Sequence, residues 1–144
     1  MNIVLGFSTR PEGRAALVRA VEEARLRSAR LIIVRTMVEE PSESPASTRA
    51  WADSIEQARS AGIALAAQLQ EQGVEAVFKM KPIGSSPADA ILEVARSEAA
   101  DLIVIGIRKR SPVGKLVLGS VSQDVVLRAE CPVLAVKATP VTTL

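Results

Sequence analysis

The stretch that decides the fold lies at residues 101–124 and reads DLIVIGIRKRSPVGKLVLGSVSQD. It opens with the apolar run 102–105, which is short and rich in β-branched residues, as is typical of a strand buried on both faces. We expect Gly106 to end this strand. A loop with four basic residues follows, and Ser120 then has the character of a helix N-cap, with Gln123 as its capping-box partner.

A strand, a basic loop and the start of a helix together predict a pocket for an anion. The first amide N–H groups of a helix lack backbone partners, and the helix dipole adds positive potential at the same place. The basic residues of the loop are Arg108, Lys109, Arg110 and Lys115. Adjacent like charges repel one another unless an anion compensates them, so we expect a nucleotide phosphate here; the alternative is an ordinary solvated loop. Gly106 would let the phosphate approach the backbone, or would only permit a tight exit from the strand.

The composition limits the possible functions. The chain has 144 residues, of which 48% are apolar, and this is enough for one domain with its own core. A net charge of +2 and few aromatic residues argue against nucleic-acid binding. The apolar runs are much shorter than the roughly 18 residues that span a bilayer, so we expect a soluble cytoplasmic protein that does not bind membranes.

The absence of histidine excludes the Ser-His-Asp and Cys-His nucleophile systems, and it leaves no imidazole for a zinc site. The single cysteine, Cys131, fits a reducing compartment. Because it begins an apolar run beside Pro132, we expect it to be a small buried hydrophobe.

Hydrophobic periodicity predicts alternating strands and helices along the whole chain. The predicted strands are 2–7, 30–37, 74–81, 102–105 and 132–136, and the predicted helices are 11–28, 50–72, a segment that starts at Ser86-Pro87, and 120–130. Such alternation predicts a single-domain α/β fold: a five-stranded parallel open sheet, Rossmann-like, with helices on both faces. A polar loop at 39–48 is a candidate flap, and Trp51 is expected in the core.

Three features resemble the universal stress protein family, and the resemblance covers essentially the whole chain. They are the five-strand alternation, the segment 84–91 (GSSPADAI) and residues 101–137. Family members that bind ATP carry a glycine, two residues, a second glycine, nine residues, and then Gly-Ser or Gly-Thr. The corresponding positions here are Gly106, Lys109, Gly119 and Ser120, so the second glycine of the pattern is a lysine.

The resemblance implies a fold like that of the adenine nucleotide alpha-hydrolases, with strand order 3-2-1-4-5. It implies a domain at 1–138 with a flexible tail at 139–144, and ATP or AMP, with or without Mg²⁺, as the ligand. The nucleotide-binding residues that it implies are Ser8, Met37, Gly106, Arg108, Lys109, Gly119, Ser120, Val121 and Ser122. Adenine would lie near Met37 and the phosphates near 106–109 and 119–122.

Two departures from the family pattern shape the prediction. Lys109 either blocks the approach of phosphate to the backbone or supplies a charge-assisted contact. Ser8 stands where nucleotide-binding relatives have an aspartate at the end of the first strand; its hydroxyl can bond a ribose or an adenine edge but brings no charge. The Walker A and dinucleotide fingerprints both fail, because Leu116 replaces the Ser or Thr of the first and no glycine cluster follows the first strand.

We therefore expect a regulator or sensor that binds an adenine nucleotide and acts on an unknown protein partner. The alternative is a dimeric interaction module of the same fold that binds no nucleotide. Without an evident general base, the chain would at most hydrolyse ATP slowly. The last strand, Val133 to Val136, has the character of an exposed edge that pairs with a second copy, and the resemblance also implies a homodimer.

Overall fold

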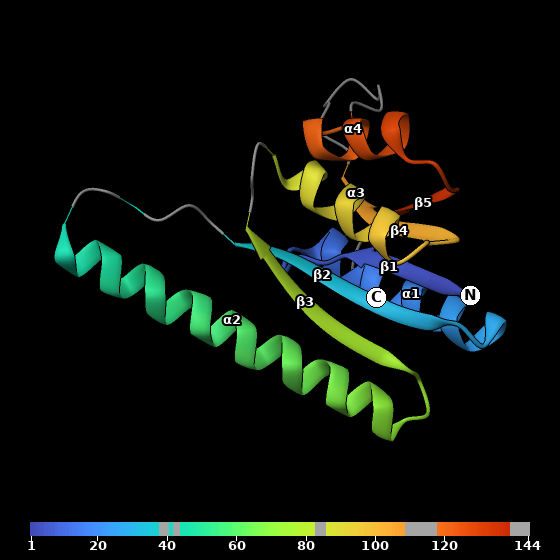
Figure 1. Cartoon of the computed structure of the whole chain (residues 1–144), viewed down its shortest axis with the longest axis horizontal. Coiled ribbons are helices and arrows are strands. Elements are labelled where there is room, and N and C mark those ends of the chain that lie inside the picture. Colours follow the sequence, from blue (N-terminus) through green and yellow to red (C-terminus); the bar gives the residue numbers. More distant parts are fainter. Residues whose placement is uncertain (38–40, 42–43, 83–85, 109–117, 139–144) are drawn as a thin grey trace, which may run out of the picture.

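The computed structural model describes residues 1–37, 41, 44–82, 86–108 and 118–138. Within these ranges strands and helices alternate as the periodicity predicts (Figure 1). The elements are β1 (Asn2–Gly6), α1 (Pro11–Arg27), β2 (Arg30–Met37), α2 (Pro45–Glu71), β3 (Ala76–Pro82), α3 (Pro87–Ser97), β4 (Leu102–Ile107), α4 (Ser120–Arg128) and β5 (Val133–Lys137). The predicted tail at 139–144 lies outside the described residues.

The strands form one parallel sheet in the order β3-β2-β1-β4-β5, which confirms the predicted topology. β1 lies in the middle, where Val4 pairs with Ile32 of β2 on one side and with Ile103 of β4 on the other. All three side chains are fully buried. The reversal of strand order on the two sides of β1 places a crevice at the carboxyl ends of β1 and β4.

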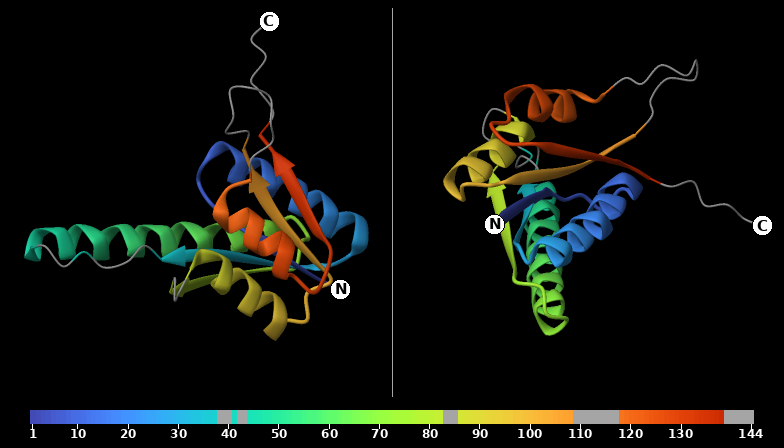
Figure 2. Two further views of the ribbon diagram at one scale, coloured as in Figure 1. Left: turned by 90° about the horizontal axis from the view of Figure 1, so that it is seen from above. Right: turned by 90° about the vertical axis from the view of Figure 1, so that its right-hand side faces the viewer.

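Helices cover both faces of the sheet, as expected from strands that are apolar on both sides (Figure 2). Alternate residues of each strand enter one of two cores. Ile3, Leu5 and Leu31 pack with the small residues of α1 and with the end of α2. Val4, Ile32 and Ile103 pack with α3 and with Val125 of α4.

α2 begins at Pro45, five residues before the predicted start, so the polar loop is shorter than expected. Ser44 is its N-cap and accepts a hydrogen bond of 3.1 Å from the backbone N–H of Ser47. Residues 39–40 and 42–43 of the proposed flap lie outside the described residues. The helix ends as predicted: Gly73, with φ of +88°, follows its last turn.

α2 is longer than the strands of the sheet. Its 27 residues span about 40 Å, whereas the 8 residues of β2 span about 26 Å. Only its C-terminal half has buried residues, at Gly62, Ala66 and Leu69, and the N-terminal half projects past the strands (Figure 1). Trp51 lies in the projecting half and is partly exposed, so the prediction that it belongs to the core is wrong.

Cys131 is only partly buried, and it packs against the core beneath α3 and α4. Burial raises the pKa of its thiol. Cys131 therefore packs against the core as expected of a small hydrophobic residue, but it is not fully buried as predicted. No helix in the described part of the chain is both long and apolar enough to cross a bilayer.

Candidate functional site

A cavity of about 440 Å³ lies at the carboxyl ends of the central strands. Its walls are the end of β1 with the turn that follows, the first turn of α1, the end of β2, the start of α3, and β4 with the start of α4. The lining residues are Gly6, Phe7, Ser8, Thr9, Arg10, Glu12, Gly13, Val34, Arg35, Thr36, Pro87, Ile91, Ile105, Gly106, Gly119, Ser120, Val121 and Ser122. Its size lies in the range of small-molecule sites.

The structure brings most of the predicted site residues together around this cavity. The predicted residues in its lining are Ser8, Gly106, Gly119, Ser120, Val121 and Ser122. Met37 and Arg108 are not part of the lining, although Met37 follows the lining residue Thr36 and Arg108 lies two residues after Gly106. Lys109 and the rest of the loop at 109–117 lie outside the described residues.

Gly106 does not end its strand, because β4 continues to Ile107 and Gly106 is paired with Val136 of β5. The sequence suggested two reasons for a glycine here, close approach of a phosphate and a tight exit from the strand. The structure shows another reason. A Cβ atom at this position would overlap the carbonyl oxygen of Glu12, in the first turn of α1. The glycine therefore allows the start of α1 to rest directly on β4.

Gly13 has a matching role, and sequence reasoning missed it. It is a buried residue of α1, and a Cβ atom there would overlap both the hydroxyl and the carbonyl oxygen of Ser8. Gly106 and Gly13 together hold the turn after β1 and the first turn of α1 close to β4. The wall of the cavity depends on this close contact.

Ser120 is not the N-cap of α4. The cap is Gly119, with φ of −64° and ψ of 160°, and Ser120 is the first helical residue. Because glycine has no side-chain acceptor, the cap makes no side-chain hydrogen bond; the backbone N–H of Gln123 donates to the carbonyl oxygen of Gly119 at 2.9 Å. The amides of Ser120, Val121 and Ser122 are thus left without a side-chain cap at the wall of the cavity.

Two arginines in the lining were not predicted. Arg10 is the N-cap residue of α1, and Arg35 lies near the end of β2. Glu12 is the one carboxylate among the lining residues. The sequence signal for the arginines was their position next to strand ends, where the side chains of a parallel sheet meet its crevice.

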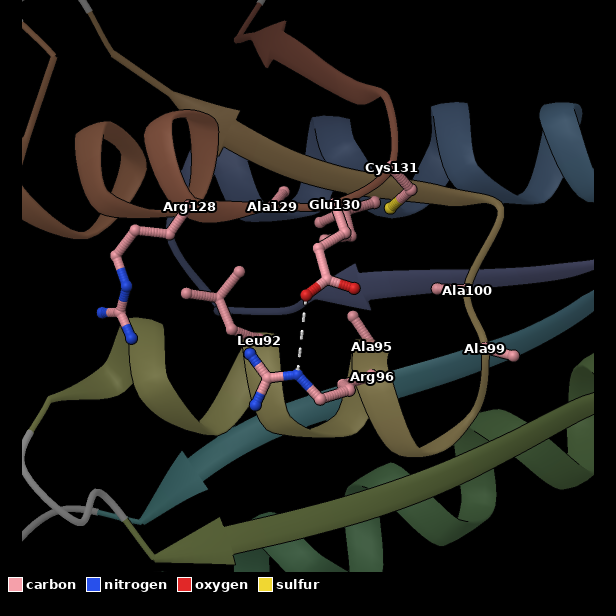
Figure 3. A pocket seen from close by; sticks show the side chains of 10 residues that line it. Leu92, Ala95, Arg96, Ala99, Ala100, Arg128, Ala129, Glu130 and Cys131 are labelled. Atoms are coloured by element: carbon pink, nitrogen blue, oxygen red, sulfur yellow. Dashed lines mark ion pairs between the residues drawn. The ribbon is translucent and has the colours of Figure 1, made fainter.

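A second cavity, of about 350 Å³, lies at the opposite end of the sheet (Figure 3). It is formed by the C-terminal half of α3 and the segment between α4 and β5. Arg96 and Glu130 lie at this cavity, with their charged atoms 3.9 Å apart, and Cys131 is also part of its lining (Figure 3). None of the predicted site residues lies there. In the described ranges, no three His, Cys, Asp or Glu side chains are grouped as a metal site would require.

Comparison with known proteins decides the family. The model of the universal stress protein family matches residues 1–137. A universal stress protein of Mycolicibacterium smegmatis is 39% identical over 136 residues, which is 94% of this chain and 96% of the relative. The chain belongs to the universal stress protein family.

Two solved universal stress proteins with bound nucleotides share this fold. One, from Archaeoglobus fulgidus in complex with dAMP, is 27% identical with a TM-score of 0.60, and the match covers 94% of this chain and 96% of that one. The other, in complex with cAMP, is 26% identical with a TM-score of 0.61, covering 96% and 98%. The family assignment made from 84–91 and 101–137 is therefore confirmed.

Proposed function

We propose that this universal stress protein binds an adenine nucleotide, AMP or ATP, in the cavity at the carboxyl ends of β1, β2 and β4, and that it acts as a cytoplasmic regulator or sensor. The observation that carries the proposal is the start of α4. The amides of Ser120, Val121 and Ser122 have no side-chain cap and line a cavity of nucleotide size. The similar proteins in complex with dAMP and cAMP support it.

In this proposal the phosphate lies at the first turn of α4, the ribose lies over the end of β1 near Ser8, and the base lies toward Thr36 and Met37. The strand order supports this direction, because β1 lies between β4 and β2. Arg108 and Lys109 would add positive charge beside the phosphate. The first turn of α1 would form one wall against the ribose.

The test is calorimetric titration of the purified chain with AMP and with ATP, in the presence and absence of Mg²⁺. The decisive variant is Ser122→Glu. A carboxylate at the third helical position stabilises a helix start but repels phosphate. We expect at least tenfold weaker binding than in the wild type. The matched control is Gln123→Glu, which adds the same charge to the same turn at an exposed residue outside the lining.

If the wild type gives no heat and carries no nucleotide when isolated, the proposal fails. Equal loss of affinity in both variants would also count against it, because the effect would then come from overall charge. A phosphate-release assay on the ATP complex tests for slow hydrolysis, which we expect to be at most a minor activity.

We also propose that the protein is a homodimer through β5, which lies at the edge of the sheet. The amide of Ile103 donates to the carbonyl oxygen of Pro132 at 3.0 Å, so the backbone of Pro132 faces β4. By strand alternation, the N–H and C=O groups of Val133 and Ala135 face the open edge. Exposed apolar residues on the neighbouring helix α4, Val126 and Leu127, would extend the interface.

Analytical ultracentrifugation of an Ala135→Pro variant tests the dimer. Proline removes one outward N–H group and is tolerated on an edge strand, so we expect a folded monomer. Ala135→Val keeps the N–H group and should remain dimeric. A dimer in both variants would exclude this interface.

The alternative function is a dimeric interaction module that binds no nucleotide. Ser8 favours it, because a hydroxyl in the lining brings no charge to a nucleoside. The same titration separates the two functions. A wild-type dimer that gives no heat with any nucleotide would support the interaction module.

A further inference from the structure

Arg10 and Arg35 form a second positive region in the cavity, away from the start of α4. Arg10 follows β1 and Arg35 belongs to β2, whereas α4 begins beyond β4. Neighbouring strands are about 4.8 Å apart, so the ends of β2 and β4 are separated by about 10 Å. A phosphate held at the first turn of α4 and the backbone of Arg35 would therefore lie on opposite sides of β1.

No carboxylate among the described residues pairs with either arginine; other described arginines also lack an ion pair, but Arg10 and Arg35 are the two in the described lining of the cavity. Arg30, in contrast, lies 2.9 Å from Glu98, and Arg128 lies 2.8 Å from Asp89. Glu12, the one carboxylate among the described lining residues, forms no ion pair with either arginine. Counted over the described lining residues, two arginines and one carboxylate give the cavity a net positive charge.

We infer that the natural ligand carries a second phosphate, on the 2′ or 3′ oxygen of its ribose, and that Arg10 and Arg35 bind it. This inference rests on the proposed function, because it takes the 5′-phosphate to lie at α4. With the ribose over β1, a phosphate on the 2′ or 3′ oxygen would be a second charge, separate from the 5′-phosphate, and we take it to lie toward Arg10 and Arg35. The guanidinium group suits this role, since it can donate two parallel hydrogen bonds to one phosphate.

The experiment compares three ligands by calorimetry at low ionic strength: adenosine 5′-monophosphate, adenosine 2′,5′-bisphosphate and adenosine 3′,5′-bisphosphate. One of the bisphosphates should bind at least tenfold more tightly than the monophosphate. The bisphosphate with the higher affinity shows whether the second phosphate lies on the 2′ or the 3′ oxygen. In Arg10→Gln and Arg35→Gln this preference, measured as the ratio of bisphosphate to monophosphate affinity in the same variant, should fall, and in the double variant it should disappear.

Arg96→Gln is the matched control, because Arg96 is an exposed arginine at the other end of the sheet. It should keep the full preference. If the monophosphate binds as tightly as both bisphosphates, the inference is overturned and the proposed function stands. Loss of the preference in Arg96→Gln as well would also overturn it. If none of the three ligands binds, the inference fails, and if ATP also gives no heat, the proposed function fails with it.

Discussion

Single residues at the end of the sheet fix how closely α1 approaches the central strands. Gly106 and Gly13 leave room for backbone atoms where any Cβ atom would overlap them. A glycine that matches a nucleotide-binding pattern is usually explained by its contact with the nucleotide. Here the close contact between Gly106 and the carbonyl oxygen of Glu12 already requires a glycine, whether or not a nucleotide binds.

Gly106→Ala should destabilise the fold by about 1–3 kcal/mol, because the added methyl group can be accommodated only by a shift of the α1 backbone. Urea unfolding measures the loss. Gly6→Ala is the control: its nearest neighbour would be the flexible Cδ1 atom of Ile91, at 2.9 Å, so the loss should be smaller. Equal stability of wild type and Gly106→Ala would contradict the packing argument.

At the other end of the sheet, Glu98, the C-cap residue of α3, links β2 to β3. Its carboxylate accepts from Lys79 at 2.5 Å and from Arg30 at 2.9 Å. Hydrogen bonds from Lys79 and then Arg30 lower the pKa of Glu98. A lowered pKa in the folded state stabilises the protein above the unfolded pKa, near 4.3, and this stabilisation is lost as the pH falls through the folded pKa.

Glu98→Gln should therefore be less stable than the wild type at pH 7, and the difference between the two should shrink as the pH falls below about 4. Urea unfolding at a series of pH values between 7 and 3 measures the effect. Glu75→Gln serves as the control, because Glu75 is 75% exposed and lies 3.7 Å from Arg30. A difference between wild type and Glu98→Gln that does not change with pH would refute the linkage.

Among the elements, α2 differs along its length. Its C-terminal half packs on β3, where Gly62 lies against the ring of Phe78, and Leu69 is 6% exposed. Its N-terminal half, with Trp51 and Ile55, is only partly buried. The two halves should therefore differ in local stability within one continuous helix.

Hydrogen exchange of the backbone amides should show this difference. Amides of residues 49–58 should exchange at least tenfold faster than those of residues 62–71, because fewer buried contacts oppose local opening. Mass spectrometry of peptides from the two halves is sufficient. Uniform protection along α2 would show that the projecting half is covered in solution.

The starts of the helices show where sequence reasoning reached its limit. The predicted helix start at Ser86-Pro87 is confirmed: Ser86 is the N-cap of α3, and its hydroxyl accepts a hydrogen bond of 3.2 Å from the amide of Asp89. Ser44-Pro45 carries the same signal, but other prolines and serines around it also favour a loop. The cap of α4 was assigned one residue too late, to Ser120 instead of Gly119, because a serine beside a glycine is the stronger capping residue by propensity alone.

At the scale of the whole molecule, strand and helix periodicity is enough to predict a parallel sheet, and the resemblance supplied the strand order. The location of the candidate site followed from that order, since ligands bind where it reverses. Arg10 and Arg35 were missed although they lie next to strand ends, because that position does not by itself say which of the residues there line the cavity; this depends on how α1 and β2 meet in three dimensions. Gly13 was missed for the same reason.

The central claim is that the cavity beside α4, and not the one beside Cys131, receives a nucleotide. Titration of the ¹⁵N-labelled chain with AMP, followed by amide chemical shifts, tests it most directly. Binding in the cavity beside α4 should give the largest shifts at Ser8, Gly106 and the amides of Ser120–Ser122. An unchanged spectrum, or shifts confined to residues around Arg96 and Cys131, would contradict it.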